Sequence, residues 1–169
     1  MSCTTLTAIT KGCDNNIGGI TAIYINDMDN VGTPTIDQTA YMVDAQTVTE
    51  PYEVFEFRRN TGNFTEESAV DFANGSSFVT ATITLMFHRR EASKSKAIKI
   101  LSEGQRDLAI IVKDANGKFW YFPYAQLSAT AEGSGTAKAD GSKYSVTFIA
   151  ENENLAYEVD PTIIAGLLA

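Results

Sequence analysis

Carboxylates are the most abundant residues in this chain that could do chemistry. Five of them gather within positions 52–73, namely Glu53, Glu56, Glu66, Glu67 and Asp71. Two carboxylates held about 5 to 10 Å apart across a cleft can hydrolyse a glycosidic bond. Acidic side chains on a hairpin more commonly form a solvated face, and no other feature of the chain indicates a cleft. We therefore expect no catalytic residue and interpret the protein as a non-enzyme.

A histidine-based metal centre or catalytic base has little support. His88 is the only histidine in the chain. A cluster of histidine ligands therefore cannot form, and a histidine base would have to be this residue. His88 ends a predicted strand, where a solvated side chain is the ordinary outcome.

Two further motifs fail on their spacing. Asp27-Met28-Asp29 resembles the start of a calcium loop, but the fifth position is Val31 and the twelfth is Gln38 instead of Glu. Gly133-Ser134-Gly135 fits neither a nucleophile elbow nor a phosphate-binding loop. The sequence thus predicts no metal and no cofactor.

The charge balance argues against a conventional nucleic-acid-binding surface. The chain has 169 residues with 13 Lys and Arg against 21 Asp and Glu, a net charge of −8. DNA binding relies on basic side chains that neutralise phosphates. The basic runs here, Arg58-Arg59 and His88-Arg89-Arg90, are short.

The N-terminal region shows no signal peptide, and no apolar run approaches the ~20 residues of a membrane span. Cys3 and Cys13 could form one bridge, but without an export signal we expect free thiols and synthesis in a reducing cytoplasm. Residues 1–17 are polar and lack a sustained period. They are either a flexible terminus or an arm that orders against a neighbouring subunit.

Strand patterns dominate the elements that must position these residues. Residues 77–88 alternate apolar side chains with threonine, which is typical of a half-buried antiparallel strand. Asn60-Thr61-Gly62-Asn63 predicts a turn that pairs 52–59 with 64–73 in an acidic hairpin, and Asp114-Ala115-Asn116-Gly117 predicts a second hairpin turn. Residues 28–51 are interpreted as a long loop. The predicted strands are 19–27, 52–59, 64–73, 77–88, 107–113, 118–124, 126–132 and 142–150.

One helix is predicted over 91–103, with Ala97, Ile98 and Leu101 on its apolar stripe. Asp160 and Pro161 are a good cap and first residue for a short terminal helix. The apolar segment 161–169 then packs either on its own sheet or on another subunit. Its candidate inter-subunit contacts are Ile163, Ile164, Leu167 and Leu168.

Together these elements predict a mainly β fold, an antiparallel β-sandwich or barrel with one flanking helix, a long hairpin and extended terminal arms. The domain organisation is an arm at 1–17, one domain at 18–160 and the apolar segment at 161–169. The aromatic run 119–124 either fills the core and an interface with alternate rings or forms a sugar-stacking platform. The first interpretation is the simpler one.

Three stretches of the chain form a distinctive set. The first is 11–20 (KGCDNNIGGI) leading into Ala22-Ile23-Tyr24-Ile25. The second is the order of strand, helix and strand over 77–113, followed by 114–120 (DANGKFW). The third is 144–150 (YSVTFIA) running to 155–160 (LAYEVD). This set resembles virion structural proteins of phages that infect Bacteroidetes-type bacteria, and its order of elements is also similar to that of phage tail-tube proteins.

The resemblance implies a structural role without catalysis. It implies homo-oligomeric, hexameric rings that stack into a tail tube around a DNA ejection channel, and a location in the virion. The implied partners are further copies of the chain, other tail or neck proteins, and genomic DNA that passes without sequence-specific binding. On this basis the acidic hairpin at 52–73 is expected to line the channel, where carboxylates repel phosphate.

Two alternatives stay open. One is a neck, connector or other virion ring protein. The other is a carbohydrate-binding or adhesin β-sandwich, which predicts that Trp120 and Tyr124 are exposed together in a groove.

Overall fold

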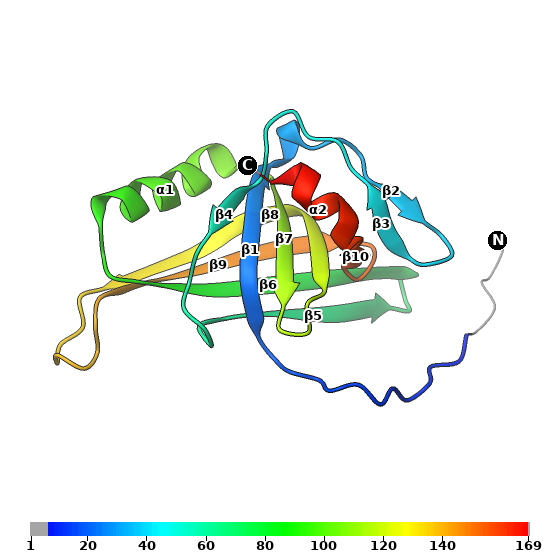
Figure 1. Ribbon diagram of the computed structural model, residues 1–169, viewed down its shortest axis with the longest axis horizontal. Helices are drawn as coiled ribbons and strands as arrows, with labels where there is room; N and C mark the ends of the chain where they lie inside the picture. The colour runs from blue at the N-terminus through cyan, green and yellow to red at the C-terminus, as the bar shows by residue number, and fades with distance from the viewer. Residues whose placement is uncertain (1–6, 169) are drawn as a thin grey trace.

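The protein is mainly β, as expected, and the computed structural model describes residues 7–168 (Figure 1). One longer helix flanks the sheet, α1 (Ala92–Ser102), and a short one, α2 (Pro161–Leu167), ends the described chain. Short 3-10 turns span Met28–Asn30 and Glu103–Gln105. The strands are β1 (Ile20–Asp27), β2 (Thr35–Asp37), β3 (Met42–Ala45), β4 (Glu53–Phe55), β5 (Gly62–Asp71), β6 (Ser76–His88), β7 (Leu108–Asp114), β8 (Phe119–Gly133), β9 (Lys143–Asn152) and β10 (Tyr157–Val159).

The strands form one curled sheet with two halves that share β8. The first half-sheet has the order β2-β3-β10-β8-β7-β1-β4, and the second half-sheet has the order β5-β6-β9-β8. The pairing of β10 with β3 is parallel, whereas the other pairings of named strands are antiparallel. The sheet is therefore mixed, and its two halves face each other.

β8 passes from one half-sheet to the other through a bend at Pro123 and Tyr124. The register against β7 shifts between the pairs Ile110 with Phe122 and Leu108 with Ala125. Pro123 has no N–H to donate to a ladder, and Tyr124 has a φ of 54°, which is rare for a residue other than glycine. The two strands predicted at 118–124 and 126–132 are thus one strand with a sharp bend.

An inner core fills the space between the two half-sheets. The alternation predicted for 77–88 is confirmed, because Ala81, Ile83, Leu85 and Phe87 of β6 are buried there. β1 and β7 contribute from the first half-sheet, and Val146 and Phe148 contribute from β9. Ile98 and Leu101 of α1 join the same core, so the predicted helix packs through two of the three apolar residues expected on its stripe.

An outer core lies on the opposite face of the first half-sheet. Ala109 and Ile111 of β7 point into this second cluster, whereas Leu108, Ile110 and Val112 point into the inner core. Because both faces of β7 are covered, its side chains are apolar without alternation. α2 covers the outer core, and its cap is the predicted one, since Asp160 Oδ1 accepts a hydrogen bond of 2.8 Å from Thr162 N.

The C-terminal segment packs on its own sheet, which is the first of its two expected placements. Ile164 is 6% exposed and Leu167 is 3% exposed, both within the outer core. Ile163 and Leu168 are partly buried against the same cluster. The four side chains therefore keep little surface with which to contact another subunit.

The predicted pairing of 52–59 with 64–73 is wrong. β4 pairs with β1, and β5 pairs with β6 across a turn that carries Gly75 at a φ of 66°. The acidic residues at 53 and 56 are therefore separated from those at 66, 67 and 71. The segment 28–51 is also more than a loop, because it holds β2 and β3, which extend the first half-sheet beyond β10.

Leu85 tests the inner core, since it is fully buried while its neighbour Thr84 points to the other face of β6. We expect Leu85→Ala to lower the free energy of unfolding by about 2 to 5 kcal/mol, because it leaves a cavity. Thr84→Ala is the control and should change it by less than about 1 kcal/mol. Urea denaturation followed by circular dichroism measures both, and equal losses would contradict this packing.

Candidate functional site

The outward face of the second half-sheet, called the open face below, is the candidate functional surface. Register places Thr82 of β6 opposite Thr65 of β5 and Ile149 of β9, and Thr84 opposite Thr147. Directly paired residues share one face of a sheet, so these side chains lie together, away from the inner core. Its central members are Thr65, Glu67, Thr80, Thr82, Thr84, Met86, Ser145, Thr147, Ile149, Glu151, Ala129 and Ala131.

Solvent reaches this face, which consists mostly of short threonine, serine and alanine side chains. The side chains in the middle of the sheet, among them Thr82 and Thr147, are half-buried, whereas the core-facing residues of the same strands are buried. Most members are short and carry a hydroxyl or a methyl group. Its charged members are Glu67 and Glu151 over the middle of the sheet, Asp71 at the end of β5, and the cation Lys143 at one end of β9. The surface is therefore smooth and neutral to acidic.

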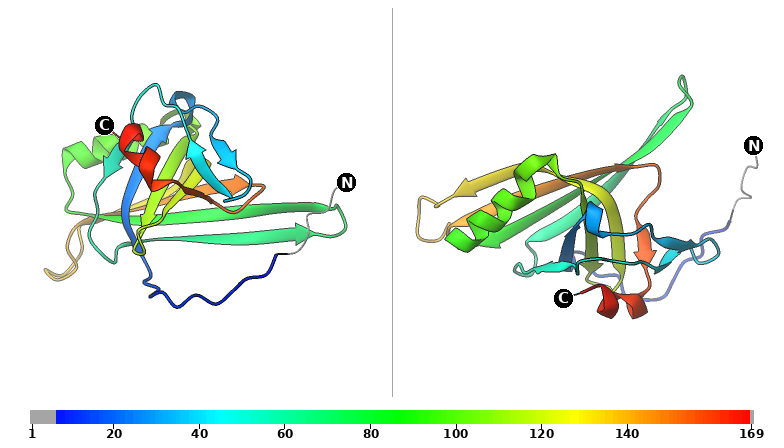
Figure 2. Two further views of the ribbon diagram at one scale, coloured as in Figure 1. Left: turned by 45° about the vertical axis from the view of Figure 1, so that its right-hand side comes forward. Right: turned by 90° about the horizontal axis from the view of Figure 1, so that it is seen from above.

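The β5–β6 hairpin projects beyond the rest of the sheet (Figure 2). The last register pair between β6 and β9 is Val79 with Asn152, so the hairpin residues 69–78 have only each other as strand partners. We call these residues the hairpin tip. It exposes three large apolar side chains, Phe72 at 93%, Val70 at 57% and Phe78 at 44%.

Asp71 organises the turn of this tip. Its Oδ1 accepts hydrogen bonds from the backbone N–H groups of Ala73 (2.9 Å) and Asn74 (3.2 Å), and its Oδ2 accepts one from Asn74 Nδ2 (2.6 Å). These donors, the Asn74 side chain first, stabilise the carboxylate and lower the pKa of Asp71. Asp71 therefore shapes the tip in addition to carrying charge.

The structure separates the five acidic residues that were expected to line one channel wall. Only Glu67 and Asp71 lie on the open face. Glu66 points to the other side of β5, where its Oε1 accepts a hydrogen bond of 2.7 Å from Ala156 N. Glu53 belongs to β4 of the first half-sheet, and Glu56 lies in the link after β4, beside Arg58 and His88.

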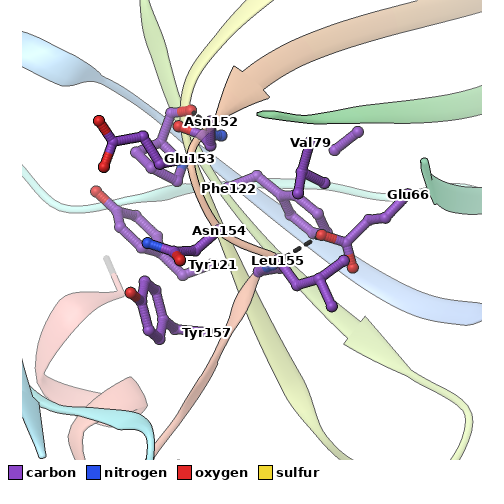
Figure 3. Close-up of a pocket in the computed structure, with 12 residues that line it drawn as sticks. Glu66, Val79, Tyr121, Phe122, Asn152, Glu153, Asn154, Leu155 and Tyr157 are labelled. Carbon is purple, nitrogen blue, oxygen red and sulfur yellow. Dashed lines mark hydrogen bonds between the residues drawn. The ribbon is translucent and has the colours of Figure 1, made fainter. Parts of the chain in front are cut away.

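A pocket of about 220 Å³ lies at the base of the hairpin (Figure 3). Its two carboxylates come from Glu66 and Glu153. Glu66 uses one oxygen to anchor the segment after β9, which is a structural role. Burial raises the pKa of Tyr121, also in the lining, to about 12, so its hydroxyl stays protonated at neutral pH.

The aromatic run does not form a paired platform. Trp120 is partly buried against the inner core, and its Nε1 donates a hydrogen bond of 3.0 Å to Asp114 Oδ2. Tyr124, at the bend of β8, is 56% exposed. The two rings are thus held differently, and the exposed groove expected of an adhesin does not contain both.

Residues 7–17 form no strand or helix, and they extend away from the folded body (Figures 1 and 2). Their hydrogen bonds are at the base, where Asn116 Oδ1 accepts from Ile17 N (2.8 Å) and Asn116 Nδ2 donates to Asn16 Oδ1 (3.2 Å). Cys13 is exposed and free, and Cys3 lies outside the described residues.

Two sequence comparisons identify no relative of this chain. No protein-family model matches the chain, and no curated protein sequence matches it. Within residues 7–168, no group of three or more His, Cys, Asp or Glu side chains is placed to hold a metal ion. No helix in the described part of the chain is long and apolar enough to cross a membrane.

The hydrogen bonds at the turn predict that the Asp71 carboxyl titrates with a pKa below that of an ordinary aspartate. Because its folded pKa is lowered, the stabilisation of the turn is complete above the unfolded value and is lost as pH falls through the folded pKa. We expect the amide shifts of Ala73 and Asn74 in an NMR titration to move at a pH below about 3.9, the ordinary Asp value. Asp71→Ala should abolish that step. A midpoint above the ordinary value would contradict the hydrogen bonds.

Proposed function

We propose that this chain is a ring-forming structural subunit of a tailed-phage particle, acting as a tail-tube protein. The observation that carries the proposal is the hairpin tip. Two strands extend past the sheet with both faces in solvent and expose Val70, Phe72 and Phe78. An exposed apolar patch on a projecting ribbon is typical of a surface that contacts another chain.

Ring closure would also protect the exposed strand edges. Among the described strands, β5 pairs only with β6, so its outer edge is open. An open edge offers unpaired N–H and C=O groups to any other strand. Head-to-tail contacts that close on themselves give a ring, and a sheet continued around a ring has no free edge. The hairpin tip of one copy is then covered by the next.

The open face supplies a suitable wall for a DNA channel. Its threonine, serine and alanine side chains are short, and Glu67 and Glu151 repel phosphate. Lysine or arginine side chains across such a wall would neutralise phosphates and release the counterions condensed on the DNA. That release would hold the DNA in the channel. The channel-lining set is thereby revised to the open face, with Glu67 and Asp71 kept from the original five. The proposed location is the virion, after synthesis in the host cytoplasm.

Electron microscopy of the purified protein at high concentration tests the proposal. Rings with a channel of about 20 Å or more, wide enough for duplex DNA, would support it. Rings that stack into tubes favour a tail tube, whereas single rings favour a neck or connector protein. Compact monomers at every concentration, also in the presence of tail components, would contradict both.

The hairpin tip predicts a specific loss of assembly. Val70→Glu with Phe72→Glu places two charges where apolar side chains are buried between subunits. Because burial of one such side chain contributes about 1.5 to 3 kcal/mol, the assembled fraction should fall at least roughly tenfold. Analytical ultracentrifugation measures it. Tyr124→Asn removes another exposed ring, outside the hairpin tip, and should assemble normally. A similar loss there would argue against the tip.

If the open face lines the channel, lysines added to it should make the assembled particle retain DNA. Thr82→Lys with Thr147→Lys places two cations diagonally across β6 and β9 on the proposed channel wall. Assembled particles of this variant should bind duplex DNA in a way that weakens as salt rises, because phosphate contacts release counterions. Ser93→Lys with Thr39→Lys adds the same charge to exposed positions outside the open face and is the control. Equal binding by both variants would place the open face outside the channel.

A further inference from the structure

A groove lies between α1 and the edge strand β4, at the end of the first half-sheet. Its volume is about 360 Å³. Its floor is apolar and reaches the inner core through Ile25, Leu101 and Leu108, which are at most 8% exposed. Ile100 of α1 lines one wall and is 41% exposed. An apolar side chain from outside could therefore extend the inner core through this opening.

The rim of the groove is acidic. Asp27, Glu50 and Glu53 surround it together with Arg106, which pairs with Asp27 at 3.0 Å. The carboxylates of Glu50 and Glu53 make no ion pair among the described residues. Asn26 Nδ2 donates a hydrogen bond of 2.7 Å to Glu50 O and so fixes the rim backbone. A segment with an apolar residue and a cation on one side would complement both the floor and the rim.

The N-terminal arm has this pattern. Ile9 is fully exposed, and Lys11 is the one charged residue between positions 7 and 13. In an extended segment, residues two positions apart point to the same side, about 6.6 Å from each other. Ile9 can thus enter the groove while Lys11 meets the rim. Thr7 to Lys11 can also pair with the outer edge of β4, which has no strand partner among the described residues.

The arm of the same copy is poorly placed for this contact. It is anchored to Asn116, beside the start of β1, whereas Asp27 at the end of β1 lines the groove. The length of β1 is about 23 Å, which equals the span from Asn16 to Ile9 when fully extended. To reach the groove of its own copy, the arm would have to reverse direction and be fully extended, with no spare length. Instead the arm runs away from the body (Figure 1).

We propose that the groove between α1 and β4 binds the N-terminal arm of a second copy of this chain. Because the arm leaves at one end of β1 and the groove opens at the other, the contact is head to tail and propagates from copy to copy. β1 crosses the direction of the β5–β6 hairpin (Figure 1). The arm contact therefore stacks rings, while the hairpin tip joins subunits within a ring. In this respect the inference rests on the proposed function.

Site-directed disulfide formation tests the contact. In a background with Cys3→Ser and Cys13→Ser, one protein carries Ile9→Cys and a second carries Ile100→Cys. After mixing and mild oxidation, a covalent dimer on a non-reducing gel is the expected result. Ile9→Cys mixed with Tyr124→Cys, whose exposed side chain does not line the groove, is the control and should give no dimer. No dimer with Ile100→Cys, or equal dimer with the control, would overturn the proposal.

Two further variants separate the possible outcomes. A single protein carrying both Ile9→Cys and Ile100→Cys should stay uncrosslinked within one chain at high dilution. An internal disulfide there would overturn the proposal in favour of the chain's own arm. Lys11→Glu should lower the dimer yield several-fold, and adding Glu53→Lys in the groove protein should restore it.

Microscopy of the uncrosslinked proteins distinguishes this inference from the proposed function. Ile9→Asp should give single rings in place of stacked tubes, because only the contact between rings is lost. Tubes formed equally well by Ile9→Asp would overturn the arm contact and leave the ring proposal standing. A dimer through Ile9 and Ile100 without closed rings would uphold the arm contact and overturn the ring proposal.

Discussion

The bend of β8 is the constraint on which the rest of the structure depends. Residues before Pro123 hydrogen-bond with β7 and β10, and residues after Tyr124 hydrogen-bond with β9. A proline cannot continue the ladder, and a positive φ at the next residue turns the chain. One strand thereby belongs to two half-sheets that face each other. The inner core is enclosed between them. Each half-sheet also has an outward face, and one of these faces is covered while the other is open to solvent.

Those two faces differ in what covers them. On the first half-sheet, β7 is apolar on both sides, and the outer core beneath α2 and the 28–51 segment excludes water. On the second half-sheet, β6 and β9 alternate strictly, and threonine occupies the side that faces solvent. A β-branched hydroxyl residue suits a strand and also tolerates water. The open face is thus specified by the same alternation that builds the inner core.

Local patterns predicted much of this fold, and long-range pairing escaped them. The alternation in 77–88, the turn at 114–117 and the cap at Asp160 each depend on neighbouring residues, and each is confirmed. The partner of β4 depends instead on β1, about thirty positions away, and no local signal specifies that choice. The bend at Pro123 also escaped the local patterns, because the effect of a proline on a ladder is the same whether a strand ends or bends.

The alternation of side chains along β5 decides which of the five carboxylates share one face of the sheet. Charge alone grouped five carboxylates, although Glu66 and Glu67 are adjacent, and adjacent residues on a strand must point to opposite faces. Parity along 64–73 already divides that set, with Glu67 and Asp71 on one side. The threonines of 77–88 share the side of Glu67 once β5 and β6 are paired. Side parity is therefore a better guide to which carboxylates share one face of a sheet than the number of charges.

The two proposed contacts also explain how the chain could stay a free subunit before assembly. The hairpin tip and Ile9 expose apolar side chains on two separate slender segments, so neither forms a broad adhesive patch. A net charge of −8 adds repulsion between free copies. Ordering the arm costs conformational entropy, which makes a single arm contact weak. Inside a ring many such contacts form at once at high effective concentration, so stacking becomes much more favourable once rings have closed.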